Sequence, residues 1–278
     1  MRDNGIQDQI KLLKDYFLKS PDVSMAFLFG SYSTGRETYE SDFDVAVYFK
    51  LWEDTNYKIE DSIWSDITEI VKKEVDLVCL NSAPASLVSN VIKTGTPLII
   101  KDKELYWDIY LKSSLEAEDF SGFAKDYFEI YKNAKSLVPE QKVRLLERLQ
   151  FLDAELKEIG IFEKLAFREY QDNKIQRRNV ERWAENIINA SIDIAKIVLA
   201  SDKKMMPKTY EEALRNFGIL AGLTEEDSKK LSRFANLRNI LAHEYLEVLY
   251  GRIQNFVKES PPLYQKVLDF LETYLGKK

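Results

Sequence analysis

The chain has 278 residues and a net charge of −6, and 45% of its residues are hydrophobic while 31% are charged. This length favours two domains, and the composition is that of an ordinary globular protein rather than a disordered one. No apolar run is long enough to span a bilayer, and the first residues lack the apolar core of a signal peptide, so we expect a cytoplasmic protein without membrane contact. One cysteine and one histidine exclude an internal disulfide and a His/Cys zinc site within one chain.

Charge is divided unevenly along the chain. Residues 1–138 hold 16 Lys and Arg against 24 Asp and Glu, whereas residues 139–278 hold 24 against 22. An acidic first part and a nearly neutral second part support two domains with different ligands. Any metal ion would be held mainly by carboxylates and water, which favours Mg²⁺ or Mn²⁺.

Helix and strand patterns alternate in the first hundred residues, which predicts an α/β arrangement. The predicted elements are a helix at 7–19, strands at 25–29 and 43–49, a helix at 57–73, a strand at 75–80 and a possible strand at 97–100.

From about residue 105 the strand pattern disappears, and the remaining sequence predicts an all-α bundle. Helical patterns cover 105–137, 140–159, 161–200, 209–217, 225–247 and 261–275, with loops at 203–207 and 260–262. The break before Pro139 gives predicted domains at 1–110 and 139–278, joined by a helical connector at 111–138.

A glycine–serine pair followed by two aspartates is the first group of residues that indicates chemistry. Gly30 follows a buried strand, and because glycine has no side chain, the backbone there can approach a phosphate closely. The Ser31 hydroxyl and nearby N–H groups can bind phosphate oxygens. Asp42 and Asp44 lie two apart on a predicted strand and so face the same way. Two such carboxylates would repel each other unless a cation lies between them, and Asp76 is a candidate third carboxylate at the same sheet edge.

Gly30-Ser31, ten residues, and Asp42-x-Asp44 resemble the minimal nucleotidyltransferases (MNT) of the DNA polymerase β superfamily, and Asp76 matches their later aspartate. The resemblance spans roughly residues 20–104. It implies an α+β domain, a mixed sheet with flanking helices, that transfers a nucleoside monophosphate from a nucleotide, usually ATP, with Mg²⁺ or Mn²⁺ held by the three aspartates.

The second group lies on one predicted helix and includes the only histidine of the chain. Asn239 and His243 share a helix face, and Arg238 and Tyr245 nearly align. His243 could move a proton of the 2′-hydroxyl or of the leaving group in RNA cleavage, while Arg238 could stabilise charge on the attacked phosphate without a metal. The simpler alternative is a structural helix in which Asn239 and His243 only form hydrogen bonds.

The spacing of these residues resembles the signature of HEPN-domain ribonuclease toxins of the HepT type. In this chain Arg238-Asn239 is followed after three residues by His243, and after one further residue by Tyr245. Residues 178–195 resemble an earlier helix of that family. The resemblance implies an all-α HEPN helical bundle that forms a homodimer around one composite cleft and acts on RNA. The charged run 174–182 could add phosphate contacts, or could be a solvated helix face.

In toxin–antitoxin pairs of this kind, the nucleotidyltransferase is the antitoxin and adenylylates the tyrosine of the toxin motif. The resemblance therefore implies transfer of AMP from ATP to Tyr245, which would place a phosphodiester beside Arg238 and silence the ribonuclease. The two components are normally separate proteins, whereas here they form one polypeptide, which raises their effective concentration.

Two other functions are compatible with the same sequence. Aminoglycoside nucleotidyltransferases also place such a domain before a helical dimerisation domain, and their acceptor is a small molecule. A catalytically silent RNA-binding or assembly module is the third hypothesis. The string around Arg238 argues against the first alternative, and the intact aspartates argue against the second.

Overall fold

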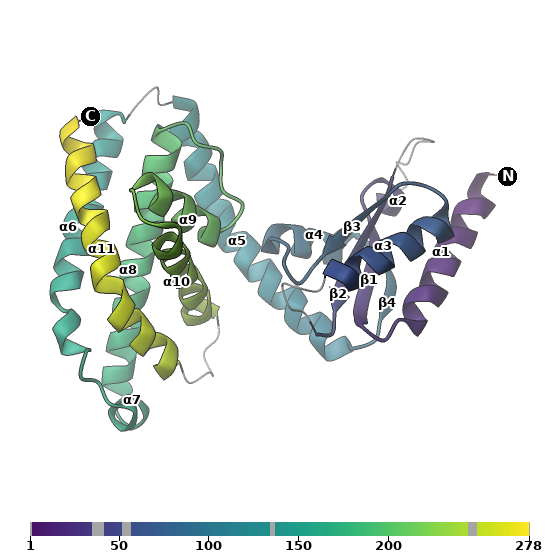
Figure 1. Cartoon of the computed structure of the whole chain (residues 1–278), viewed down its shortest axis with the longest axis horizontal. Coiled ribbons are helices and arrows are strands. Elements are labelled where there is room, and N and C mark those ends of the chain that lie inside the picture. Colours follow the sequence, from purple (N-terminus) through teal and green to yellow (C-terminus); the bar gives the residue numbers. More distant parts are fainter. Residues whose placement is uncertain (1, 35–41, 52–56, 134–136, 244–248, 278) are drawn as a thin grey trace. The chain divides into compact units, whose positions relative to one another are not determined.

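The computed structural model describes residues 2–34, 42–51, 57–133, 137–243 and 249–277. It divides the chain into two compact units, Met1–Glu118 and Asp119–Lys278, each of which is described by itself (Figure 1). Within the described residues, no helix combines the length and the apolar character that a membrane crossing requires.

The first unit is built from one sheet and its covering helices. Its elements are α1 (Arg2–Lys19), β1 (Val23–Phe29), α2 (Ser31–Thr34), β2 (Phe43–Phe49), α3 (Tyr57–Val71), β3 (Val75–Cys79), α4 (Ala85–Thr94), β4 (Thr96–Ile100) and the start of α5 (Lys103–Asn133).

The sheet is mixed and has the strand order β3-β2-β1-β4. Strand β1 is antiparallel to β2 and β4, whereas β2 and β3 run parallel. Leu13, Phe17 and Ile67 of α1 and α3 pack on one face, and Val91 of α4 and Ile109 of α5 pack on the other. Apolar residues on both faces explain why β1 is buried along nearly its whole length.

The predicted strands are present, and β1 begins two residues earlier than the pattern indicated. Helix α4 was not predicted; its short apolar spacing, with Val88, Val91 and Ile92 buried, was the signal that could have found it. Asp42 lies just before β2 rather than on it, so the prediction that both aspartates are on a strand is wrong for this residue.

The second unit is entirely helical in the described residues. Its elements are the rest of α5, α6 (Pro139–Lys157), the 3₁₀ turn η1 (Ile159–Ile161), α7 (Phe167–Asp172), α8 (Lys174–Ser201), α9 (Tyr210–Leu220), α10 (Glu225–His243) and α11 (Tyr250–Lys277). Helix α8 contacts α6, α9, α10 and α11, which makes it the centre of the bundle. The fold class, an α+β unit followed by a helical bundle, is confirmed.

The predicted single helix at 161–200 is wrong, because the chain forms η1, α7 and α8 over this stretch. The Asn173 side chain accepts hydrogen bonds from the backbone N–H groups of Ile175 and Gln176 and so caps α8. An asparagine cap satisfies donors that a helix start leaves unpaired, and it fixes the beginning of α8.

The predicted loop at 260–262 is also wrong, because α11 continues through Pro261 and Pro262. Each proline removes a backbone hydrogen bond and costs roughly 3 kcal/mol in a helix interior. Leu263, Tyr264 and Val267 are almost completely buried directly after them, and each such side chain contributes about 1.5–3 kcal/mol. Tertiary packing therefore offsets the local preference of the prolines.

Candidate functional site

Gly30 directly follows β1 and has a conformation that other residues rarely adopt, with a φ angle of 70°. A Cβ atom at this position would lie 2.0 Å from the Oδ2 atom of Asp44. The backbone therefore passes directly beside the carboxylate, which only glycine allows. The sequence prediction concerned a close approach of this backbone to a phosphate, and it stays a prediction; the close approach in the structure is to the Asp44 carboxylate.

The strands place the aspartates beside one another. Asp44 pairs with Phe29 of β1 on one side and with Asp76 of β3 on the other. Asp42 is exposed immediately before β2, and Asp76 is exposed on β3. The three predicted carboxylates therefore meet at one edge of the sheet, next to the start of α2.

The Asp44 carboxyl has an unfavourable environment for its negative charge. Burial raises its pKa, and the charges of Asp76 and Asp42 raise it further, while a hydrogen bond from the Ser31 backbone lowers it. Such mutual repulsion is what a divalent cation relieves. The donor set therefore fits Mg²⁺ or Mn²⁺, which prefer carboxylate oxygens.

Among the side chains that the structure describes, no three His, Cys, Asp or Glu residues form a ready-made metal cage. The aspartates are neighbours at an open edge, so water and phosphate oxygens would complete the coordination, as is usual for Mg²⁺.

An aromatic contact holds the Gly30-Ser31 turn against β2. The Tyr32 ring stacks on Phe43 with centroids 4.1 Å apart, and Lys73 donates a hydrogen bond of 2.7 Å to the Tyr32 hydroxyl. Since Phe43 lies between Asp42 and Asp44, this contact fixes the Gly30-Ser31 turn relative to both carboxylates.

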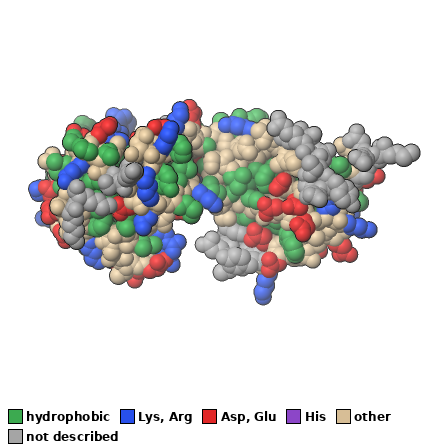
Figure 2. All heavy atoms as spheres, turned by 90° about the horizontal axis from the view of Figure 1, so that it is seen from above, with side chains coloured by type: hydrophobic (Ala, Val, Ile, Leu, Met, Phe, Trp, Pro, Cys, Tyr) green, Lys and Arg blue, Asp and Glu red, His purple; other side chains and the backbone are tan. Residues whose placement is uncertain are grey.

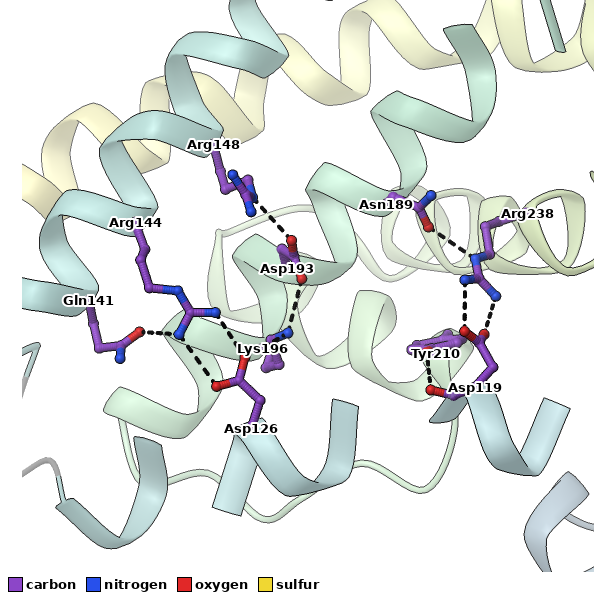
Figure 3. A network of polar contacts seen from close by, with 10 residues as sticks. All are labelled: Asp119, Asp126, Gln141, Arg144, Arg148, Asn189, Asp193, Lys196, Tyr210 and Arg238. Atoms are coloured by element: carbon purple, nitrogen blue, oxygen red, sulfur yellow. Dashed lines mark hydrogen bonds and ion pairs between the residues drawn. The ribbon is translucent and has the colours of Figure 1, made fainter. Parts of the chain in front are cut away.

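Arg238 of α10 lies in a polar network that joins three other helices (Figure 3). Its Nη1 and Nη2 atoms form a bidentate ion pair with Asp119 of α5, with 3.1 Å between Nη2 and Oδ1. Its Nε donates a hydrogen bond of 3.0 Å to Asn189 Oδ1 of α8. The guanidinium carbon also lies 5.2 Å from the centroid of the Tyr210 ring of α9.

The Arg238 side chain is 13% exposed, so its charge is largely removed from water. Burial alone would lower its pKa, but the hydrogen bonds and charge of Asp119 outweigh burial and raise it. Burial and the Asp119 charge also raise the pKa of Tyr210, whose hydroxyl donates to the Asp119 backbone carbonyl. Arg238 and Tyr210 therefore carry their usual protons at neutral pH.

The rest of the predicted arginine site is described only in part. Asn239 is half-buried and lies next to Arg238, with 3.5 Å between Arg238 Nη1 and its Oδ1. His243 is the last residue of α10, and its side chain and the whole of Tyr245 lie outside the described residues. The roles of these residues remain predictions.

The charged run at 174–182 forms the first turns of α8. Arg178 is exposed, and the exposed Arg182 pairs with Glu185 at 2.9 Å. The phosphate contacts predicted for this run likewise stay a prediction.

Two family models match successive parts of the chain. One, described as polymerase beta, nucleotidyltransferase, matches residues 11–104, and the other, described as ribonuclease HepT-like, matches residues 146–270. A relative named protein adenylyltransferase MntA, from Shewanella oneidensis, is 36% identical over 99 residues, which are 35% of this chain and 68% of that protein. The chain belongs to the polymerase β-type nucleotidyltransferases and carries a HepT-like domain.

The HepT-like unit has its own curated relative. The protein named tRNA nuclease HepT, from Aphanizomenon flos-aquae, is 28% identical over 125 residues, which are 44% of this chain and 85% of that protein. A solved structure described as a toxin–antitoxin with AMP-PNP shares 26% identity, covers 43% of this chain and 97% of its own, and has a TM-score of 0.36. The predicted resemblance to both families is confirmed.

Sequence reasoning missed three residues around Arg238 in the HepT-like unit. Asn189, Tyr210 and Asp119 come from three different helices, and Asp119 precedes the segment that the HepT-like model matches. An acidic residue in a predicted helical connector looks like a solvated position, so no local signal marked Asp119.

Proposed function

We propose that this chain is a toxin–antitoxin fusion in which the nucleotidyltransferase unit transfers AMP from ATP to Tyr245 of the HepT-like unit. The observation that supports it most directly is the Gly30 backbone against the Asp44 carboxylate, with Asp76 paired in register beside it. The acceptor is chosen because Tyr245 follows Arg238 and His243 in a HepT-like unit, and because a relative of the first unit is named a protein adenylyltransferase.

In this reaction the phenolic oxygen of Tyr245 forms a bond to the α-phosphorus of ATP. The bond from that phosphorus to the bridging oxygen breaks, pyrophosphate leaves, and the phenolic proton passes to water or to a site carboxylate. Ser31 and the Gly30 turn bind the phosphates, and Asp42, Asp44 and Asp76 hold the cation. A bound Mg²⁺ or Mn²⁺ would neutralise developing charge on the phosphates.

The silenced activity is a metal-independent endoribonuclease of the HepT-like unit. The 2′-hydroxyl attacks the adjacent phosphorus, the bond to the 5′-oxygen breaks, and His243 moves the proton between these oxygens. Arg238, supported by Asn239, stabilises the phosphate charge. Transfer RNA is the first substrate to test, because the relative of this unit is named a tRNA nuclease.

Intact mass spectrometry after incubation with ATP and Mg²⁺ tests the transfer. Wild-type protein should gain one or more AMP groups, while Tyr245→Phe and Asp42→Asn/Asp44→Asn should gain none. Tyr250→Phe is the matched control, because Tyr250 is a nearby tyrosine whose hydroxyl donates to the Leu165 carbonyl, and it should be modified like wild type. Adenylylation of an aminoglycoside without modification of the protein would replace this proposal by the small-molecule alternative.

Growth of producing cells tests the ribonuclease. Asp42→Ala/Asp44→Ala should be toxic because Tyr245 stays unmodified, and adding His243→Ala should relieve the toxicity. Equal growth of all variants would contradict the ribonuclease activity.

Because we also propose a homodimer through the HepT-like unit, light scattering should give about twice the 32.4 kDa of one chain.

A further inference from the structure

The surroundings of Arg238 leave little room for a phosphate. Asp119 takes the edge between Nη1 and Nη2, Asn189 takes Nε, and the guanidinium carbon lies over the Tyr210 ring. Bidentate binding through one of these edges is how arginine recognises phosphates. Within the part of the chain that the structure describes, both edges are therefore occupied by side chains of the protein itself (Figure 3).

Asp119 also cancels the charge that RNA binding would use. A carboxylate in bidentate contact with a guanidinium forms a pair of zero net charge, and such a pair stabilises an added phosphate far less than a free cation does. Asp119 is 28% exposed, which is more than Arg238, so the carboxylate is the partner that water reaches more easily. An RNA phosphate would have to displace it.

We propose that Asp119 is an internal competitor of RNA: its carboxylate occupies the phosphate-binding position at Arg238 and so weakens RNA binding and slows cleavage, without abolishing them, even when no AMP is attached. This inference rests on the proposed role of Arg238 in binding RNA phosphate. Asp119 precedes the HepT-like match at 146–270, and it lies on α5, a helix that begins in the nucleotidyltransferase unit. The restraint is therefore supplied by a segment outside the matched ribonuclease domain.

A second acidic residue of α5 provides a matched control. Asp126 forms ion pairs with Arg144 and Lys196, at 2.8 and 2.9 Å, and does not contact Arg238 (Figure 3). Asp126→Asn and Asp119→Asn remove the same charge from the same helix, and each weakens an ion pair of α5 within the bundle. Only Asp119→Asn removes the carboxylate charge from Arg238.

The experiment measures binding of fluorescently labelled bulk tRNA by anisotropy, in a background of Asp42→Asn/Asp44→Asn/His243→Ala that neither adds AMP nor cleaves RNA. Asp119→Asn should tighten binding at least about fivefold more than Asp126→Asn does. It should also steepen the slope of log affinity against log salt by roughly 0.7–0.9, the value for one additional phosphate contact. Adding Arg238→Ala should abolish both gains.

Equal affinities of the Asp119→Asn and Asp126→Asn proteins, or weaker binding by Asp119→Asn, would overturn the inference. Tyr210→Phe keeps the ring and loses only the hydrogen bond to the Asp119 carbonyl, so it should bind like the background. Circular dichroism melting curves should show that each variant is folded.

The cleavage assay separates this inference from the proposed function. Its background protein carries Asp42→Asn/Asp44→Asn and keeps His243. Adding Asp119→Asn to this background should make it cleave tRNA faster. If no protein cleaves tRNA but Asp119→Asn still tightens binding through Arg238, the ribonuclease proposal fails and the competition by Asp119 stands. If cleavage occurs but Asp119→Asn changes neither binding nor rate, the ribonuclease stands and the competition is refuted.

Discussion

At Gly30 the backbone conformation places the chain directly beside a carboxylate of the candidate nucleotidyltransferase site. Its positive φ and the Asp44 oxygen that a Cβ would strike both require glycine. Gly222 has a similar φ of 80° but no atom within 4 Å of a Cβ built on it. The two glycines therefore separate backbone strain from contact with the carboxylate.

Gly30→Ala should abolish transfer of AMP and lower the free energy of unfolding by about 1–3 kcal/mol, because it adds a clash to the strain. Gly222→Ala carries the strain without the clash, so it should cost about 1–2 kcal/mol, less than Gly30→Ala, and leave the transfer unchanged. Denaturant unfolding and intact mass spectrometry measure the two effects. Full transfer by Gly30→Ala would contradict the close approach to Asp44.

Asp44 links the site to the pH dependence of stability. Burial and the neighbouring aspartates raise its pKa, so the folded state binds this proton more tightly than the unfolded state. Its stabilising contribution is present below the unfolded pKa of about 3.9 and is lost as pH rises through the folded pKa.

Without divalent metal, Asp44→Asn should therefore raise the unfolding midpoint at pH 7, and the gain should shrink towards pH 4. Added Mg²⁺ should stabilise wild type and have little effect on the variant. Urea titrations at both pH values provide the measurement. A gain that is equally large at pH 4 would show that repulsion at Asp44 is not its cause.

At the scale of elements, α11 and α8 contain two buried serines with opposite surroundings. Ser191 Oγ lies 2.7 Å from the Ile187 carbonyl and 3.0 Å from the Tyr264 hydroxyl. Ser260 Oγ, just before the two prolines of α11, is buried and has no hydrogen-bond partner among the described residues. Removing a satisfied hydroxyl and removing an unsatisfied one should have different costs.

Ser260→Ala should be neutral or stabilise the protein by up to about 1 kcal/mol, because the alanine buries no unpaired polar atom. Ser191→Ala should destabilise it by about 1–2 kcal/mol, since it leaves the buried Tyr264 hydroxyl without this partner. Thermal and denaturant unfolding compare the two variants. Destabilisation by Ser260→Ala as large as that by Ser191→Ala would indicate a partner for Ser260 in solution.

At the scale of the whole molecule, the two units have separate hydrophobic cores and different charge. The nucleotidyltransferase unit packs helices on both faces of its sheet, and the HepT-like unit forms a core around α8. Figure 2 shows acidic side chains gathered on one face of the nucleotidyltransferase unit, in agreement with the excess of Asp and Glu in residues 1–138. A negatively charged face of this kind favours a bound cation over a free nucleotide phosphate.

Calorimetric unfolding should therefore respond to ATP and Mg²⁺ through the nucleotidyltransferase unit. At a hundred times the dissociation constant, the ligand should stabilise that unit by about 2.7 kcal/mol. Asp42→Asn/Asp44→Asn should remove the shift. An equal shift in the double variant would place nucleotide binding elsewhere in the chain.

The sequence by itself indicated those parts of both candidate sites that depend on local patterns. Gly30 and Asp44 could be predicted because a strand, a turn and a second strand follow each other within a few residues, and the strand period decides which side chains share a face. Arg238 and Asn239 could be predicted because they belong to one helical string. The fold class followed from hydrophobic periodicity, which reports burial directly.

Only the tertiary structure decided what surrounds Arg238. Asp119 is 119 positions away along the chain and Asn189 is 49 positions away. Helix periodicity shows which face of each helix is apolar, but not which polar residue of one helix meets a charge on another. The packing of α5, α8 and α9 around α10 brings Asp119, Asn189 and Tyr210 to the Arg238 guanidinium. These contacts stabilise its charge, since a guanidinium that is buried away from water needs partners to remain charged.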